Sequence, residues 1–269
     1  MSHPRISVFA GSADAAKGTI IPIRTLQGQA TLQARTAHEV AVDTVHNEIV
    51  VPNPFAQAIL FYRDDAGGDE KPLRIIQGPK TLLGGSMDTD NIALDTVHDE
   101  VYTTQESSDT VLVFPSRASG DVAPLRVLHG PKTELRFPRR VAVDPVNNLM
   151  AVVASKGILF FDRSANGDVS PSCVIAGPNT GLGGMEGMGL SKVILNASAK
   201  KIIFGGGSRR VQRGQQKEKS FMAVWKYGDC GDVPPLYKMK QGSGRFDLNT
   251  KTKEIIMSGG NVISMPEAF

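Results

Sequence analysis

The sequence is poor in the residues on which several protein classes depend. Its 269 residues include only two cysteines, Cys173 and Cys230, and one tryptophan. Two cysteines define no disulfide framework, so a reducing compartment is the simpler expectation. The formal net charge is only +3, and aromatic residues make up 6% of the chain. This composition does not favour a nucleic-acid binder, because such proteins usually carry a strongly basic face.

Long apolar runs and the common catalytic motifs are also missing. No run approaches the length of about 18 apolar residues that a membrane-spanning helix needs. The first residues, MSHPRISVFAG, lack a basic region followed by an apolar one, so we expect no signal peptide, no membrane contact and a cytoplasmic protein. Walker A, HExxH, CxxC and GxSxG motifs are absent, and the glycine-rich stretch 181–189 contains no GxGxxG. Nucleotide-binding, zinc-protease, dithiol and hydrolase-elbow chemistry are therefore unsupported.

What the chain does contain is a repeat. An apolar run ending in Asp or Asn recurs with spacings of 52, 49, 52 and 53 residues, at Asp43, Asp95, Asp144, Asn196 and Asn249. Three further apolar runs follow in most copies; in the first copy they are EIVV, AILFY and PLRIIQG. Short alternating runs separated by polar turns predict antiparallel strands. Four strands in each repeat of this length are typical of a propeller blade.

The chain ends predict that the blades close into a ring. Residues 6–9 and 21–28 look like a third and a fourth strand without the first two, and residues 246–265 lack a fourth strand. We predict an all-β β-propeller of four-stranded antiparallel blades, closed by the N-terminal strands joining the C-terminal blade. The sequence favours five blades in one domain, 1–269, with six blades as the alternative. The predicted blades are 38–78, 90–130, 139–177, 191–242 and 245–269 plus 1–28.

These repeats are similar to a known group of proteins. Stretches such as VAVDTVHNEIVV (40–51) and ILFFDRSANGDVSPSCVIAG (158–177) resemble the NHL repeat and related six-bladed propeller families. The resemblance covers almost the whole chain and implies a fold rather than a function. It also implies that first strands line a central channel. The loops before first strands and those between second and third strands would then share one face, called the top face below.

The residues just before the first strands differ in chemistry although the strands are nearly interchangeable. The residue pairs at these positions are His38–Glu39, Asp90–Asn91, Arg139–Arg140, Ser191–Lys192 and Gly244–Arg245. Such unequal groups around one rim predict a small-molecule site at the top of the channel, although solvated loops that diverge freely would give the same pattern. The predicted substrate-binding residues are Asp90, Asn91, Phe137, Arg139, Arg140, Glu186, Lys192 and Arg245.

Three residues form the predicted catalytic set. Asp247 stands in a first strand where the other copies have alanine or isoleucine, and a buried carboxylate is costly unless it is paired. It is either a functional group or half of an ion pair between blades. His38 would transfer protons, with Asp247 or Glu39 as base or orienting group. We therefore predict an acid–base enzyme of lyase, hydrolase, isomerase or cyclase type. A noncatalytic module that binds a protein partner is the alternative.

Other candidate groups are weaker. No cofactor is predicted, but Glu39, Asp90, Asn91 and Asp247 would offer oxygen ligands to calcium or magnesium. The basic insertion at 205–220 predicts a lid that carries Arg209, Arg210 and Arg213, with a solvated loop as the alternative. His46 and His98 recur in the turns TVHNE and TVHDE. We interpret these two histidines as turn scaffold rather than as a site.

Overall fold

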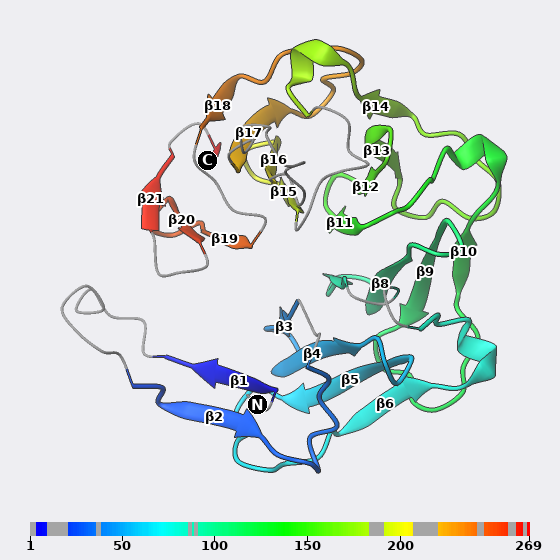
Figure 1. The fold of residues 1–269 in the computed structure, drawn as a ribbon, viewed down its shortest axis with the longest axis vertical. Helices are drawn as coiled ribbons and strands as arrows, with labels where there is room; N and C mark the ends of the chain where they lie inside the picture. The colour runs from blue at the N-terminus through cyan, green and yellow to red at the C-terminus, as the bar shows by residue number, and fades with distance from the viewer. Residues whose placement is uncertain are drawn as a thin grey trace, which may run out of the picture. The chain divides into compact units, whose positions relative to one another are not determined.

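The computed structural model describes residues 4–9, 21–35, 39–85, 88, 91–182, 191–206, 220–240, 245–257, 262–265 and 268–269. Within these residues, 21 strands form four four-stranded sheets, one three-stranded sheet and one two-stranded sheet (Figure 1). The helical elements η2 (Pro79–Thr81), η3 (Pro131–Thr133) and η4 (Pro178–Thr180) are single 3-10 turns. The fold is the predicted all-β, five-bladed propeller, with its strands where the repeat placed them.

Each blade follows the chain from one strand to its antiparallel neighbour. Blade 1 contains β3 (Ala41–Asp43), β4 (Glu48–Asn53), β5 (Ala58–Arg63) and β6 (Arg74–Gln77). Blade 2 contains β7 (Ala93–Asp95), β8 (Glu100–Gln105), β9 (Thr110–Pro115) and β10 (Arg126–Leu128). Blade 3 contains β11 (Arg140–Asp144), β12 (Leu149–Ala154), β13 (Gly157–Asp162) and β14 (Cys173–Ile175).

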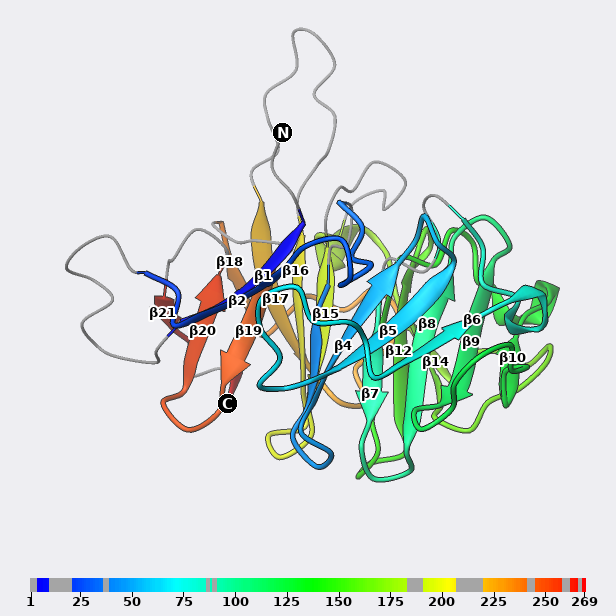
Figure 2. The same ribbon diagram turned by 90° about the horizontal axis from the view of Figure 1, so that it is seen from below.

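The last blades follow the same order. Blade 4 contains β15 (Lys192–Asn196), β16 (Lys201–Gly206), β17 (Phe221–Lys226) and β18 (Tyr237–Met239); Figure 2 shows β15, β16 and β17 side by side. Blade 5 contains β19 (Phe246–Asn249), β20 (Glu254–Met257) and β21 (Val262–Ser264). The N-terminal strands β1 (Arg5–Val8) and β2 (Arg24–Gln27) pair with each other. Their predicted pairing with blade 5 stays a prediction.

The chain divides into two compact units, residues 1–101 with 114–125 and residues 102–113 with 126–269. In the first unit, β2, β4 and β5 bury a core that includes Leu26, Leu60 and Tyr62. In the second, blades 3 and 4 bury a larger core around Phe160 and Trp225. The central strands carry β-branched and aromatic side chains, which pack well on a pleated surface. The prediction of a single domain stays a prediction.

One tie recurs between consecutive repeats. A glycine after β2, β6, β10 and β14 has a φ of 125–138° and lies against an aspartate from the turn between strands three and four of the next repeat. That aspartate accepts a 2.7 Å hydrogen bond from the backbone N–H two residues after the glycine. The four glycine–aspartate pairs are Gly28 and Asp69, Gly78 and Asp121, Gly130 and Asp168, and Gly177 and Asp232. We call each pair a repeat clamp.

A second tie joins the same elements at two junctions and is replaced by a disulfide at another. The guanidinium groups of Arg24 and Arg74 each donate to a backbone carbonyl in the next repeat, those of Asp64 and Ser116. At the corresponding position of blade 3 the residue is Cys173, which forms a disulfide with Cys230 of blade 4. Neither cysteine was predicted to form this bond. Disulfides are typical of oxidising compartments. The bond between Cys173 and Cys230 therefore removes the reason for expecting a reducing compartment.

The described helices are too short to cross a membrane.

Candidate functional site

The predicted rim residues that the structure describes form links between neighbouring blades. Asn91, which is 2% exposed, donates its side-chain N–H to the carboxylate of Glu39. Arg140 donates from Nε to the carbonyl of Ser191 at 2.7 Å and from Nη1 to the carbonyl of Arg139 at 2.8 Å. Links of this kind join neighbouring blades, and a ligand site at this rim stays a prediction.

Two further pairs involve charged rim residues. Arg139 lies 3.3 Å from the carboxylate of Glu106, and Lys192 lies 3.6 Å from that of Asp247. The second pair joins blades 4 and 5. The alternative interpretation of Asp247, an ion pair between blades, therefore describes its observed contact. Arg245 is exposed at the start of β19.

The expected burial of Asp247 is wrong, because its side chain is 75% exposed. The reason lies in the alternation of side chains along a strand. Phe246 takes the inward position of β19 and is 4% exposed, as do Ile92 and Val193, each 3% exposed, in their blades. The next position faces the less buried side, so Asp247 needs no compensation for lost solvation.

Six predicted site residues lie outside the described part of the chain. They are His38, Asp90, Glu186, Arg209, Arg210 and Arg213. Their catalytic, binding and lid roles stay predictions, as does a calcium or magnesium site that uses Asp90. Among the described residues, no three His, Cys, Asp or Glu side chains gather in a way that could hold a metal ion.

The histidines in the first turns act as scaffold, in agreement with the sequence interpretation. His46 Nδ1 lies 2.9 Å from Asp43 Oδ2, and His98 Nδ1 lies 2.8 Å from Asp95 Oδ2. The other carboxylate oxygen of Asp43 accepts the backbone N–H groups of Val45 and His46. Burial alone would raise the pKa of Asp43, but these hydrogen bonds outweigh burial and lower the pKa. In Asx turns of this type, the side chain replaces a turn hydrogen bond.

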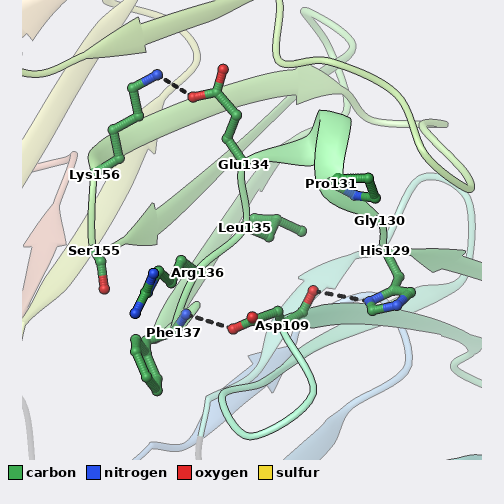
Figure 3. A pocket seen from close by; sticks show the side chains of 10 residues that line it. All are labelled: Asp109, His129, Gly130, Pro131, Glu134, Leu135, Arg136, Phe137, Ser155 and Lys156. Atoms are coloured by element: carbon green, nitrogen blue, oxygen red, sulfur yellow. Dashed lines mark hydrogen bonds and ion pairs between the residues drawn. The ribbon is translucent and has the colours of Figure 1, made fainter.

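An open pocket of about 670 Å³ lies at the junction of blades 2 and 3 (Figure 3). Its walls come from the β8–β9 turn, the end of β10, the loop from η3 to β11 and the β12–β13 turn. These are the two classes of loop that the sequence analysis assigned to the top face. The lining residues are Asp109, His129, Gly130, Pro131, Glu134, Leu135, Arg136, Phe137, Ser155 and Lys156. The predicted set included only Phe137 among them.

The repeat clamp fixes one wall of this pocket. Asp168 accepts the N–H of Lys132 at 2.7 Å, while the Thr133 hydroxyl donates to the Gly130 carbonyl at 2.6 Å and accepts the N–H of Leu135 at 3.2 Å. Leu135 is then 5% exposed, which anchors the loop. The residues that follow, Arg136 and Phe137, are exposed.

Phe137 is held in an unusual backbone conformation. Its φ is +50°, a region that bulky side chains rarely adopt. The ten other described non-glycine residues with positive φ fall at three turn positions that recur along the chain, and Phe137 belongs to none of them. Its N–H donates to Asp109 Oδ1 at 2.8 Å, and the carbonyl of Arg136 accepts the N–H of Ser155 at 2.8 Å. Strain maintained by its surroundings is a mark of functional sites.

The charged groups of the pocket are partly paired. Lys156 and Glu134 form an ion pair, and Figure 3 shows Asp109 between Phe137 and His129. His129 Nδ1 lies 3.3 Å from Thr110 Oγ1 and 3.5 Å from the Asp109 carbonyl. The guanidinium carbon of Arg136 lies 5.6 Å from the centre of the Phe137 ring, within the range of a cation–π contact.

The sister repeats lack this set of side chains. Where this junction has Arg136–Phe137 after its clamp, the others have Ala34–Arg35, Gly84–Gly85 and Gly183–Gly184. Where it has His129, they have Gln27, Gln77 and Ala176. A comparison of GPKTELRF with GPKTLLGG and GPNTGLGG would therefore have singled out this loop from the sequence. The residues directly before the first strands do not include this loop, so their differences did not reveal it.

Comparisons with known proteins show the fold. No family model and no curated protein matches the chain. A solved structure of a putative 6-phosphogluconolactonase from Bacteroides uniformis is 13% identical with a TM-score of 0.58, covering 94% of this chain and 72% of that one. Hydrazine synthase from Kuenenia stuttgartiensis is 10% identical with a TM-score of 0.54, covering 83% of this chain and 56% of that one.

A third similar structure is a domain. The β-propeller domain of Cps50 (Swd1) from Myceliophteria thermophila is 10% identical with a TM-score of 0.54, covering 82% of this chain and 62% of that one. The chain thus spans less than two thirds of the hydrazine synthase and Cps50 chains. At such low identity these similarities establish the propeller, which hosts enzymes and noncatalytic modules alike.

Proposed function

We propose that this protein binds a small organic molecule in the pocket at the junction of blades 2 and 3. The observation that carries the proposal is Phe137, an exposed aromatic residue held at positive φ where a sister repeat has glycine. Loops that only close a blade need no such strained residue. Concave sites with a few polar groups around an apolar surface are typical of small-ligand binding.

The sister repeats supply the variant that tests this proposal. In H129Q/R136G/F137G, each residue is replaced by its counterpart at the preceding junction, Gln77, Gly84 and Gly85. The fold should persist because that loop type already occurs in this chain. Saturation-transfer difference NMR with a fragment library should give a group of fragments that bind the wild type and not the triple variant. If the triple variant binds every fragment as the wild type does, this pocket is not the functional site.

An acid–base enzyme is the second candidate, and His129 favours it. When Nδ1 carries the proton, it can donate to Thr110 Oγ1 or to the Asp109 carbonyl, which leaves Nε2 as a base. The similarity to a structure described as a putative 6-phosphogluconolactonase also supports hydrolytic chemistry. A panel of lactones and esters, followed by NMR, tests this candidate. H129Q should abolish turnover, and equal turnover in H129Q would exclude His129 as the base.

A noncatalytic protein-interaction module remains the alternative to ligand binding. The similarity to the Cps50 propeller domain supports it. A protein partner would bury a wide surface, whereas the proposed ligand occupies one pocket. A fragment group that depends on residues 129, 136 and 137 would favour the ligand site, because a protein partner would depend on a wider set of surface residues.

A further inference from the structure

The hydrogen-bonding groups of the blade 2–3 pocket are unequally satisfied. Lys156 is paired with Glu134, and a carboxylate oxygen of Asp109 already accepts the N–H of Phe137. The guanidinium of Arg136 has no hydrogen bond or ion pair with the described residues; its recorded contact is the Phe137 ring. A guanidinium presents five donors in a planar fork that matches a carboxylate. Arg136 can therefore offer this fork to an anionic ligand.

The charges around Arg136 limit the size of that anion's charge. Asp109 and Glu134 line the same pocket, so its formal charge is zero when Arg136 and Lys156 are counted against them. A dianion such as a phosphate monoester would gain one guanidinium and meet two carboxylates. Like charges in close proximity disfavour binding. A monoanion with the planar geometry of a carboxylate is the better match.

The apolar part of the pocket indicates the rest of the ligand. Phe137 is 42% exposed, and its backbone bonds to Asp109 and the neighbouring Ser155–Arg136 bond fix where it lies. The exposed part of the Phe137 ring can stack on a planar partner, and the guanidinium carbon of Arg136 lies 5.6 Å from the centre of that ring. Leu135 adds an aliphatic side chain beside them. A planar aromatic group is favoured over a puckered ring of the same volume.

We infer that the ligand of this pocket is an aromatic monocarboxylate, held by Arg136 through its carboxylate and by Phe137 through its ring. This inference rests on the proposed function and names the class of ligand. It assigns Arg136 the role of recognising the anion, and Phe137 that of selecting planarity.

The experiment compares four probes by 15N-HSQC titration of the full chain. They are sodium benzoate, cyclohexanecarboxylate, phenyl phosphate and inorganic phosphate. Benzoate should bind, with shifts at residues 134–137, and cyclohexanecarboxylate should bind about 5- to 10-fold more weakly because it cannot stack. Phenyl phosphate and inorganic phosphate should bind more weakly than benzoate. R136K should weaken benzoate binding about 10-fold, because lysine keeps the charge and loses the fork.

The outcomes separate the ligand class from the proposed function. Cyclohexanecarboxylate or phenyl phosphate binding as tightly as benzoate would overturn the ligand class, as would R136K binding like the wild type. No binding of benzoate would overturn it as well. In each case the fragment experiment still decides the proposed function, since fragments of another chemistry that depend on residues 129, 136 and 137 would uphold the pocket.

Discussion

Arg74 holds Glu48 through two parallel hydrogen bonds of 2.6 Å each, from Nη1 to Oε1 and from Nη2 to Oε2. Both side chains are buried, with 11% and 5% of their surfaces exposed. Arg74 also covers the ring of Phe61 at 4.0 Å and donates to the Ser116 carbonyl at 2.7 Å. The pair thus joins strands within blade 1 and ties that blade to the next repeat.

Glu48→Gln should therefore destabilise the protein strongly. Removing one partner of a buried pair leaves an uncompensated charge, and the free energy of unfolding should fall by about 3 kcal/mol. The exposed pair of Arg63 and Glu70 provides the matched control, in which Glu70→Gln should cost far less because water screens the pair. Urea unfolding at pH 7 measures both. Equal losses in the two variants would contradict a special role for the buried pair.

The same carboxylate makes stability depend on acid. Burial alone would raise the pKa of Glu48, but the hydrogen bonds and charges of Arg74 and Arg117 outweigh it and lower the pKa. A depressed pKa in the folded state contributes stability that is fully present above the unfolded value of about 4.3 and is lost as the pH falls through the folded value. The stability gap between wild type and E48Q should therefore narrow from pH 7 to pH 3. A gap that stays constant would refute the assignment.

The repeat clamps predict a steric effect at their glycines. A Cβ added to Gly78 would lie 2.5 Å from the carboxyl group of Asp121, at a φ of +138°. Gly78→Ala should lower the free energy of unfolding by about 2 kcal/mol or more, from backbone strain and overlap together. At Gly120, where φ is +81° and no atom lies within 4 Å, alanine should cost about 1 kcal/mol. Adding D121G to G78A should recover part of the lost free energy of unfolding, because it removes the side chain that overlaps the new Cβ. If the double variant recovers nothing, overlap with Asp121 is not the cause of the loss.

Replacing Phe137 by glycine should not destabilise the protein, although most truncations of a side chain do. Glycine tolerates positive φ while alanine does not, so F137G should be about 1 kcal/mol more stable than F137A. F137G should also match or exceed the wild type, because it relieves the strain at +50°. Chemical denaturation of the three proteins provides the comparison. F137A and F137G of equal stability would argue that the backbone there is not strained.

The disulfide predicts a redox-dependent stability. Cys173 and Cys230 are 57 residues apart in sequence, and closing a loop of this length stabilises by about 4 kcal/mol in the chain-entropy model. C173A/C230A should lose most of this amount under oxidising conditions. Dithiothreitol should destabilise the wild type and leave the variant unchanged. A wild type that alkylates at both cysteines without reductant would show that the bond does not form.

The fold was accessible from sequence because a blade is defined by local signals. Alternating apolar runs, turn residues and the regular return of Asp43, Asp95 and Asp144 are all set by neighbours along the chain. Burial depends instead on which side of a strand faces a neighbouring sheet. At the position equivalent to Asp247, Ala41 and Ala93 are only partly buried while Ala142 is 8% exposed, so an alanine in the other repeats does not determine whether Asp247 is buried.

The pocket and the disulfide escaped the sequence analysis for a related reason. Cys173 replaces an arginine and reaches Cys230 only after two blades pack, which spacing does not reveal. His129 and Arg136 became candidates when the structure brought three loops together. The signal was present as a departure from the repeat, and the comparison of equivalent loops would have detected it without coordinates.

The four repeat clamps have a consequence for how such a chain can change. Each of the four described clamps uses a glycine, an aspartate and a backbone donor at equivalent positions, so one unit put in place of another should keep its clamp. Only the junction of blades 3 and 4 has the additional disulfide between Cys173 and Cys230. At the junction of blades 2 and 3, the side chains that differ from the other repeats lie in the exposed loop residues that follow the clamp. A binding specificity like that of Arg136 and Phe137 can therefore arise at another junction through changes at a few loop positions, while the repeat clamp there stays unchanged.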